Sequence, residues 1–326
     1  MVTRIIVVLL LSLVHSSVGL AQLEQSKKVA RIGYLTGSSS IGIRTEAFRE
    51  GLRELGYVEG QNIVIEYRSA EGESSRLPDL AAELVRRKVD VIVAAGGSPA
   101  IQAAESATRT IPIVMPAMTD PTAWGFIVSL DRPGGNITGL SIRGYELIGK
   151  RLELLKEIFP KLSRVAVFWN PRSTSADLRL KQTEAASQAL GLQLQSLDVQ
   201  GPNDLEDAFK AAVKTRAGGL TVGAGPVFTL NRKRILDFAA KNRLPAIYPW
   251  KEYVDDGGLM SYAPNLSYHY RRAAYYVDKI LKGTKPADLP VEQSIKFEMI
   301  INLNAAKQIG LTIPQSVLFR TDRVIK

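Results

Sequence analysis

Short apolar segments alternate with amphipathic helical segments along most of the chain, and this alternation limits the fold more than any other feature. Residues 91–95, Val-Ile-Val-Ala-Ala, are apolar at every position, which is typical of a strand buried on both faces of a parallel sheet. The first group of predicted strands covers residues 29–37, 62–68, 89–95, 111–115 and 136–141. A second group covers residues 164–169, 193–199, 219–222 and 245–248. The pattern therefore predicts an α/β protein.

The pattern restarts after a long amphipathic helix predicted over residues 145–159, which ends at Pro160. Two consecutive α/β blocks of similar length predict two Rossmann-like, doubly wound lobes rather than a single, unusually large sheet.

A further strand at 258–264 with a helix at 267–281 fits the first lobe, and a strand at 294–303 fits the second. The chain would then cross between the lobes at three hinges. The predicted N-terminal lobe comprises residues 29–141 plus 259–285, and the C-terminal lobe comprises residues 142–258 plus 286–326.

The first 21 residues have the pattern of an export signal. Arg4 supplies positive charge, residues 5–14 form an apolar run, and Gly19 and Ala21 are small residues at the cleavage-determining positions. A retained membrane anchor is the alternative, but an apolar run of this length is too short to cross a hydrocarbon core about 30 Å thick. The chain has no cysteine to carry a lipid. We expect cleavage after Ala21 and a protein freely soluble in the periplasm.

Composition favours binding over catalysis. The chain has no cysteine and two histidines, one of which, His15, lies in the predicted signal. Thiol nucleophiles, thiolate metal sites and most histidine-based acid-base schemes are therefore excluded. We expect no metal and no cofactor, and we read the remaining His269 as a surface or packing residue.

The net charge of +10, from 42 basic and 32 acidic residues, does not indicate nucleic-acid binding. Basic residues such as those at 86–88, 232–234 and 271–272 lie on predicted helices with acidic or apolar residues between them, which favours a solvated surface.

Ligands of open parallel sheets bind beyond the carboxyl ends of the strands. The predicted loops at these ends are rich in glycine, which lets a ligand approach the backbone, and in hydroxyl and amide side chains. The candidate ligand-binding residues on them are Thr36, Ser38, Gly97, Ser98, Thr119, Asp120, Asn170 and Gly225.

Ser98 is predicted to cap a helix that starts at Pro99. Its free backbone N–H groups would then suit a ligand carboxylate, although a capped helix with nothing bound is an open alternative. No Gly-Lys-Ser/Thr follows the glycine-containing loop at 36–40, so a nucleotide-binding P-loop is not indicated.

Asp120 precedes Pro121 and could pair with a ligand ammonium, or form only a local turn. Asn170, before Pro171, has the same ambiguity. Together with the Ser98 loop, Asp120 predicts a zwitterionic, amino-acid-like ligand.

Trp250 and Tyr262 flank the predicted return crossing and could sandwich a flat ligand, although most aromatic side chains in a chain of this size belong to the core. Arg143 could bind a carboxylate or form a hinge salt bridge.

Seven segments resemble one known family, the ABC transporter substrate-binding proteins of the tryptophan/tyrosine-binding-like type. They are residues 31–35, 48–62, 76–78, 120–121, 132–139, 170–171 and 305–311. The resemblance covers about residues 29–326. It implies a type I periplasmic-binding-protein fold, in which two lobes joined by three hinge strands close on a ligand.

The resemblance implies the ligand-capturing component of an ABC-type importer, with a membrane permease as partner and an amino-acid-like ligand, which is aromatic for some members of the family. A sensory partner of a membrane receptor has the same fold and is the first alternative. A hydrolase is the second, but no Gly-x-Ser-x-Gly elbow or clustered carboxylate pair supports it. We expect a monomer that is not an enzyme.

Overall fold

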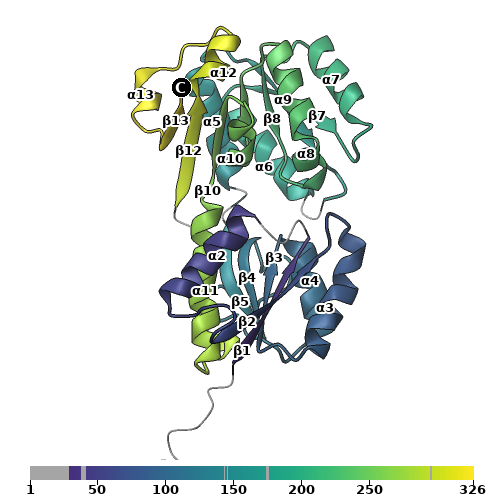
Figure 1. The fold of residues 1–326 in the computed structure, drawn as a ribbon. Helices are drawn as coiled ribbons and strands as arrows, with labels where there is room; N and C mark the ends of the chain where they lie inside the picture. The colour runs from purple at the N-terminus through teal and green to yellow at the C-terminus, as the bar shows by residue number, and fades with distance from the viewer. Residues whose placement is uncertain (1–28, 38–41, 143, 145, 174–175, 294–295) are drawn as a thin grey trace, which may run out of the picture.

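The computed structural model describes residues 29–37, 42–142, 144, 146–173, 176–293 and 296–326. It has two α/β lobes, one above the other in Figure 1. The strands of the first lobe are β1 (Ala30–Thr36), β2 (Ile63–Ser69), β3 (Val91–Ala95), β4 (Ile113–Thr119), β5 (Ile137–Ile142) and β11 (Glu292–Gln293). The strands of the second lobe are β6 (Arg164–Trp169), β7 (Gln193–Asp198), β8 (Gly219–Val222), β9 (Ala246–Tyr248), β10 (Met260–Pro264), β12 (Phe297–Asn302) and β13 (Arg323–Ile325). The helices are α2 (Ile43–Glu54), α3 (Leu77–Arg86), α4 (Ser98–Ala107), α5 (Glu146–Ile158), α6 (Ala176–Ala189), α7 (Leu205–Lys214), α8 (Pro226–Leu230), α9 (Arg232–Lys241), α10 (Lys251–Asp255), α11 (Leu266–Leu281), α12 (Leu303–Gln308) and α13 (Gln315–Leu318).

Both sheets have the strand order of a doubly wound fold. In the first lobe the order is β11-β5-β4-β3-β1-β2, and the neighbouring strands are parallel. In the second lobe the order is β13-β12-β10-β9-β8-β6-β7, in which β10 and β12 are antiparallel and the other neighbours are parallel. The winding direction reverses between β1 and β3 in one sheet and between β6 and β8 in the other. The predicted pair of doubly wound α/β lobes is confirmed.

Helices cover both faces of the sheets because strand side chains alternate between the faces. Val91 and Val93 of β3 pack with α2 and α11 on one face, whereas Ile92 and Ala94 pack with α3 and α4 on the other. Two further apolar clusters cover the faces of the second sheet. Burial on both faces therefore explains the all-apolar strands of the sequence.

The chain passes between the lobes three times, but the predicted assignment of residues 259–285 to the first lobe is wrong for its strand. Strand β10 pairs with β9 and β12 of the second sheet. Its place follows from the short helix α10, because strands joined by a brief connection usually lie near each other in one sheet. Of the two elements predicted within 259–285, the helix α11 does return to the first lobe, where it packs against α2 (Figure 1). Strand β11, predicted in the second lobe, pairs with β5 of the first.

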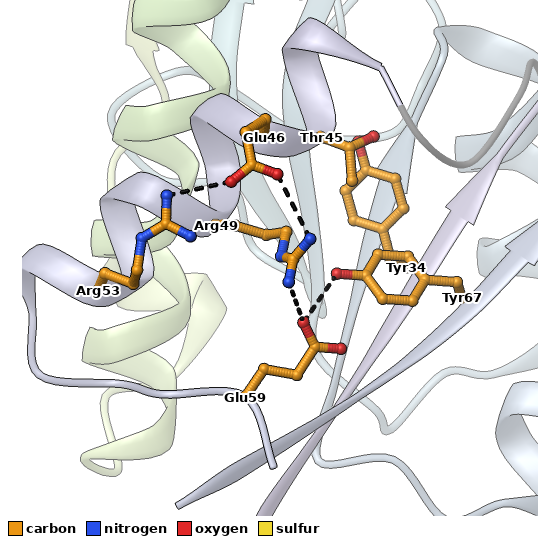
Figure 2. A network of polar contacts seen from close by, with 7 residues as sticks. All are labelled: Tyr34, Thr45, Glu46, Arg49, Arg53, Glu59 and Tyr67. Carbon is orange, nitrogen blue, oxygen red and sulfur yellow. Dashed lines mark hydrogen bonds and ion pairs between the residues drawn. The ribbon is translucent and has the colours of Figure 1, made fainter. Parts of the chain in front are cut away.

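A polar network joins α2 to the edge strand β2 of the first lobe (Figure 2). Glu46 of α2 accepts hydrogen bonds from Arg49 at 3.3 Å and from Arg53 at 3.0 Å. Glu59, in the loop before β2, pairs with Arg49 at 3.1 Å and accepts a hydrogen bond from the Tyr67 hydroxyl at 3.4 Å. Such exposed ion pairs each contribute only roughly 0–1 kcal/mol. The network therefore positions α2 against β2 more than it stabilises the lobe.

His269, in the first turn of α11, is fully buried. His269 is therefore a packing residue of the interior and not a surface residue. Burial lowers the pKa of its imidazole to about 4, because the protonated ring would have to lose its hydration.

This pKa predicts an acid-sensitive contribution to stability. In the unfolded chain the imidazole takes up a proton near pH 6.5, whereas in the folded protein it stays neutral down to about pH 4. The contribution of the neutral imidazole to the free energy of unfolding is therefore fully present above pH 6.5. It is lost as the pH falls from 6.5 to about 4. We expect it to amount to about 3 kcal/mol. His269→Gln should make the free energy of unfolding less dependent on pH between these limits, as measured by urea unfolding. Parallel pH profiles for the two proteins would contradict the prediction.

Candidate ligand-binding site

A cavity of about 100 Å³ lies where the winding of the second sheet reverses. The carboxyl ends of β6 and β8 and the helices α5 and α6 form most of its lining. Thr119, at the end of β4, and Ile142, at the end of β5, line it from the first lobe. The cavity is therefore a contact zone of both lobes at a topological switch point, where doubly wound folds bind ligands.

Much of the lining is apolar, and three large aromatic side chains contribute to it. Trp169 is the last residue of β6, Phe228 lies in α8, and Trp250 directly precedes α10. The Trp169 Nε1 is buried without a hydrogen-bond partner among the described residues. Leu147 and Leu180, from α5 and α6, add aliphatic surface. Such a lining suits a flat or bulky apolar group.

Arg151 of α5 brings a buried positive charge to the same cavity. It is only 8% exposed, and its Nε donates to the Tyr262 carbonyl at 2.8 Å. Its Nη2 lies 3.5 Å from the Pro249 carbonyl, at the limit of a hydrogen bond. Burial, and next the nearby charge of Arg179, lowers the pKa of the Arg151 guanidinium to about 10. Even this pKa leaves Arg151 charged at neutral pH.

Arg179 of α6 is the second cationic side chain of the lining. Its Nη1 donates to the Ala224 carbonyl at 3.4 Å. Asn170 and Ser173, in the loop after β6, add polar atoms, and the Ser173 hydroxyl donates to the Asn170 carbonyl at 2.9 Å. Within the described residues, no Asp or Glu lines this cavity. The electrostatic character of the lining is thus positive.

A contact between the lobes lies beside Trp250. Arg44 of α2 pairs with Glu252 of α10 at 2.9 Å, and its guanidinium lies 6.0 Å from the centre of the Trp250 ring. Arg44 of the first lobe therefore contacts the second lobe next to Trp250, which lines the cavity.

The structure brings together some of the residues that the sequence predicts. Thr119, Asn170 and Trp250 line the cavity. Ser38 and Arg143 lie outside the described residues. The predicted residues that do not line it are Thr36, Gly97, Ser98, Asp120, Gly225 and Tyr262. Contact of these residues with a ligand stays a prediction.

The loop before α4 differs from the prediction by one residue. The helix begins at Ser98, so Gly97 rather than Ser98 occupies the N-cap position. Gly96 and Gly97 have φ angles of 108° and 91°, which only glycine adopts readily. Both glycines lie in the turn from β3 into α4, and the helix begins one residue earlier than predicted.

Asp120 has a φ angle of 48°, and its Oδ1 accepts a hydrogen bond from the Ala123 N–H at 3.0 Å. This is the local turn that the sequence left open as an alternative. Gly225 caps α8 next to Ala224 of the lining. The Tyr262 ring packs against Phe297, with ring centres 5.8 Å apart.

Sequence reasoning missed Arg151 and Arg179, although the sequence contains a signal for the first. Leu147, Leu152 and Leu155 mark the apolar stripe of α5, and Arg151 falls on that stripe at helical spacing, four residues from both Leu147 and Leu155. A charged residue on a buried stripe indicates a functional or structural partner.

Two absences apply to the described part of the chain. No cluster of three or more His, Asp or Glu side chains there could hold a metal ion. Nor does any helix in that part have the length and apolar character needed to cross a bilayer.

Several known proteins are similar to this chain in sequence and in their two-lobed fold. The chain is 27% identical over 288 residues to the tyrosine-binding protein of Clostridioides difficile strain R20291, covering 88% of this chain and 82% of the relative. An ABC domain from Streptococcus pneumoniae, solved in complex with L-Trp, is 26% identical with a TM-score of 0.82, covering 91% of this chain and 99% of the other. A conserved domain protein from Vibrio cholerae is 28% identical with a TM-score of 0.83, covering 91% of this chain and 100% of the other.

A glucose-galactose binding protein from Geobacillus stearothermophilus, at 14% identity and a TM-score of 0.60, shares the fold alone, over 84% of this chain and 98% of its own. The fold is that of the type I periplasmic binding proteins. The family model described as ABC transporter substrate binding protein matches residues 28–325. The chain therefore belongs to the ABC transporter substrate-binding proteins, a family of binding proteins and not of enzymes.

Proposed function

We propose that this protein captures a small amino-acid-like ligand with an aromatic side chain outside the cytoplasm and delivers it to the membrane permease of an ABC importer. The observation that carries the proposal is the cavity at the switch point of the second sheet, with Trp169, Phe228 and Trp250 in its lining. Its apolar lining can bury an aromatic side chain, and its polar groups can orient the charged end of the ligand.

Two relatives support this ligand class, since one is named for tyrosine binding and another was solved with L-Trp. The contribution of Thr119 and Ile142 from the first lobe supports capture between the lobes. A ligand held there would favour the closed arrangement, because it contacts both lobes at once. The export signal predicted at residues 1–21, which lie outside the described residues, supports a location in the periplasm.

Ligand identity can be tested directly. The purified protein is denatured, the released small molecules are identified by mass spectrometry, and the refolded protein is assayed with L-tryptophan, L-tyrosine, L-leucine and glucose. We expect an aromatic amino acid to raise the melting temperature most, because its side chain fits the apolar lining of the cavity. A ligand at 100 times its dissociation constant adds about 2.7 kcal/mol of stability.

Two tryptophan variants provide a matched comparison. Trp250→Ala should reduce the ligand-induced rise in melting temperature, because it removes one wall of the cavity. Trp124→Ala should lower the melting temperature without ligand but keep that rise, because Trp124 packs against the first-lobe core and does not line the cavity. Equal ligand responses in both variants, or a response to glucose alone, would contradict the proposed function.

A further inference from the structure

The cavity contains a buried positive charge that the described part of the chain does not neutralise. Arg151 donates to the carbonyls of Tyr262 and Pro249, which are polar but carry no net charge. No ion pair is formed between Arg151 and a carboxylate within the described residues. A buried charge without an opposite charge is costly. The arrangement is therefore suited to a ligand that brings a negative charge.

A second guanidinium makes the cavity still better suited to a negatively charged group. Arg179 lines the same cavity from the neighbouring helix α6 and acts electrostatically on Arg151. Two like charges in one cavity repel each other, and an anion that contacts both would offset this repulsion. Because no Asp or Glu of the described residues lines the cavity, its charge favours the acidic end of an amino acid over the basic end.

We propose that Arg151 and Arg179 bind the carboxylate of the ligand. The inference rests on the proposed function, because it assumes that this cavity is the ligand site. A guanidinium presents its N–H groups in a planar fork that matches a carboxylate. The Nη1 of Arg151 has no acceptor among the described residues, so it is the donor that remains for the ligand. The Trp169 Nε1, in the same lining, is a further donor without an acceptor there.

The acid end of the ligand then lies in the second lobe, because α5 and α6 belong to it. The sequence predicts a carboxylate at the Ser98 loop, which belongs to the first lobe and does not line the cavity. With both arginines on α5 and α6, the second lobe alone can hold the acid end before the first lobe closes over it.

The test compares each acid with its own primary amide, because the amide keeps the shape and removes the charge. The probes are L-tryptophan and L-tryptophanamide, L-tyrosine and L-tyrosinamide, and L-leucine and L-leucinamide, measured by calorimetry on the purified protein after bound ligand has been removed. We expect the preferred acid to bind at least about 30-fold more tightly than its amide, which is the lower end of the range for losing one partner of a buried charge pair.

Variants assign the effect to the two arginines. Arg179→Met should weaken binding of the acid and leave binding of the amide nearly unchanged. The ratio of the affinity for the acid to the affinity for the amide should therefore fall. Lys181→Met removes one positive charge from an exposed position of the same helix and should leave the ratio as it is. Arg151→Lys keeps the charge that faces the carbonyls of Pro249 and Tyr262 but loses the planar fork. It should weaken binding of the acid more than that of the amide.

The outcomes separate this inference from the proposed function. Equal affinities for an aromatic acid and its amide would overturn the carboxylate inference and leave the proposed function in place. Discrimination of acid from amide in the leucine pair alone would support the inference and overturn the aromatic part of the function. Binding of no acid would overturn both. An unchanged ratio in a folded Arg179→Met protein would also overturn the inference.

Discussion

Replacing Gly51 with alanine is expected to lower the free energy of unfolding by at least about 2 kcal/mol. Gly51 lies in α2 where that helix meets α11. A Cβ atom there would lie 2.3 Å from the Arg271 carbonyl oxygen and 2.9 Å from the Ala274 Cβ. Backbone cannot move away as a flexible side chain does, so the two helices would have to separate and expose apolar surface.

Gly149 provides a matched control, since it is also a glycine within a helix, α5. A Cβ atom at this position meets only the Ala186 Cβ at 3.6 Å, an ordinary contact. Gly149→Ala should therefore be neutral or stabilising by up to about 1 kcal/mol, because alanine has the higher helix propensity. Urea unfolding followed by circular dichroism measures both changes. Equal stabilities for the two variants would mean that α11 does not return to the first lobe as closely as the structure has it.

The elements of each lobe were predictable because their patterns are local. The strands predicted at 164–169 and 219–222 have the same bounds as β6 and β8, since apolar runs between polar loops specify buried strands directly. By contrast, β11 has only two residues, Glu292 and Gln293, and no apolar run. Its pairing with β5 depends on the path of the chain after α11, which no local pattern encodes.

The residues of β10 do not by themselves indicate the sheet to which the strand belongs. All but one of the residues of β10 are buried, and the exception, Tyr262, is partly buried. Such a strand fits the centre of either sheet equally well. Its neighbours are fixed by the antiparallel pairing with β12, between segments separated by the whole of α11. The brief connection through α10 favours the second sheet, where β10 also pairs with β9.

The candidate site was predictable in position but not in charge. Parallel sheets place ligand loops at the carboxyl ends of strands, and this rule led to Thr119 and Asn170, which line the cavity, as well as to residues that do not. Trp250 was predicted instead from its place beside the return crossing. The rule gives no information about helix side chains that reach the cavity from its sides. Arg151 reaches it from the buried stripe of α5, where the carbonyls of Pro249 and Tyr262 accept its hydrogen bonds. These contacts join segments about 100 residues apart, and they exist only in the folded lobe.

Replacing Asp120 with asparagine tests whether the amine end of the ligand is recognised by the first lobe. Asp120 follows Thr119, which lines the cavity, and its carboxylate would meet a ligand ammonium if closure brought the two together. Asparagine tolerates the positive φ angle at this position, and its Oδ1 can still accept the Ala123 N–H. The fold should therefore be retained, whereas binding of L-tryptophan should weaken by roughly 2–5 kcal/mol.

The same variant should bind 3-(indol-3-yl)propionate as the unaltered protein does, because this compound keeps the carboxylate and lacks the amine. Calorimetry with both compounds isolates the ammonium pair, and Asp131→Asn, at an exposed acid of the same lobe, controls for the general loss of negative charge. An unchanged affinity of Asp120→Asn for L-tryptophan would mean that Asp120 serves only its turn. The ligand would then be selected by its carboxylate and its apolar body, and the positive cavity of the second lobe would accept acids whether or not they carry an amine.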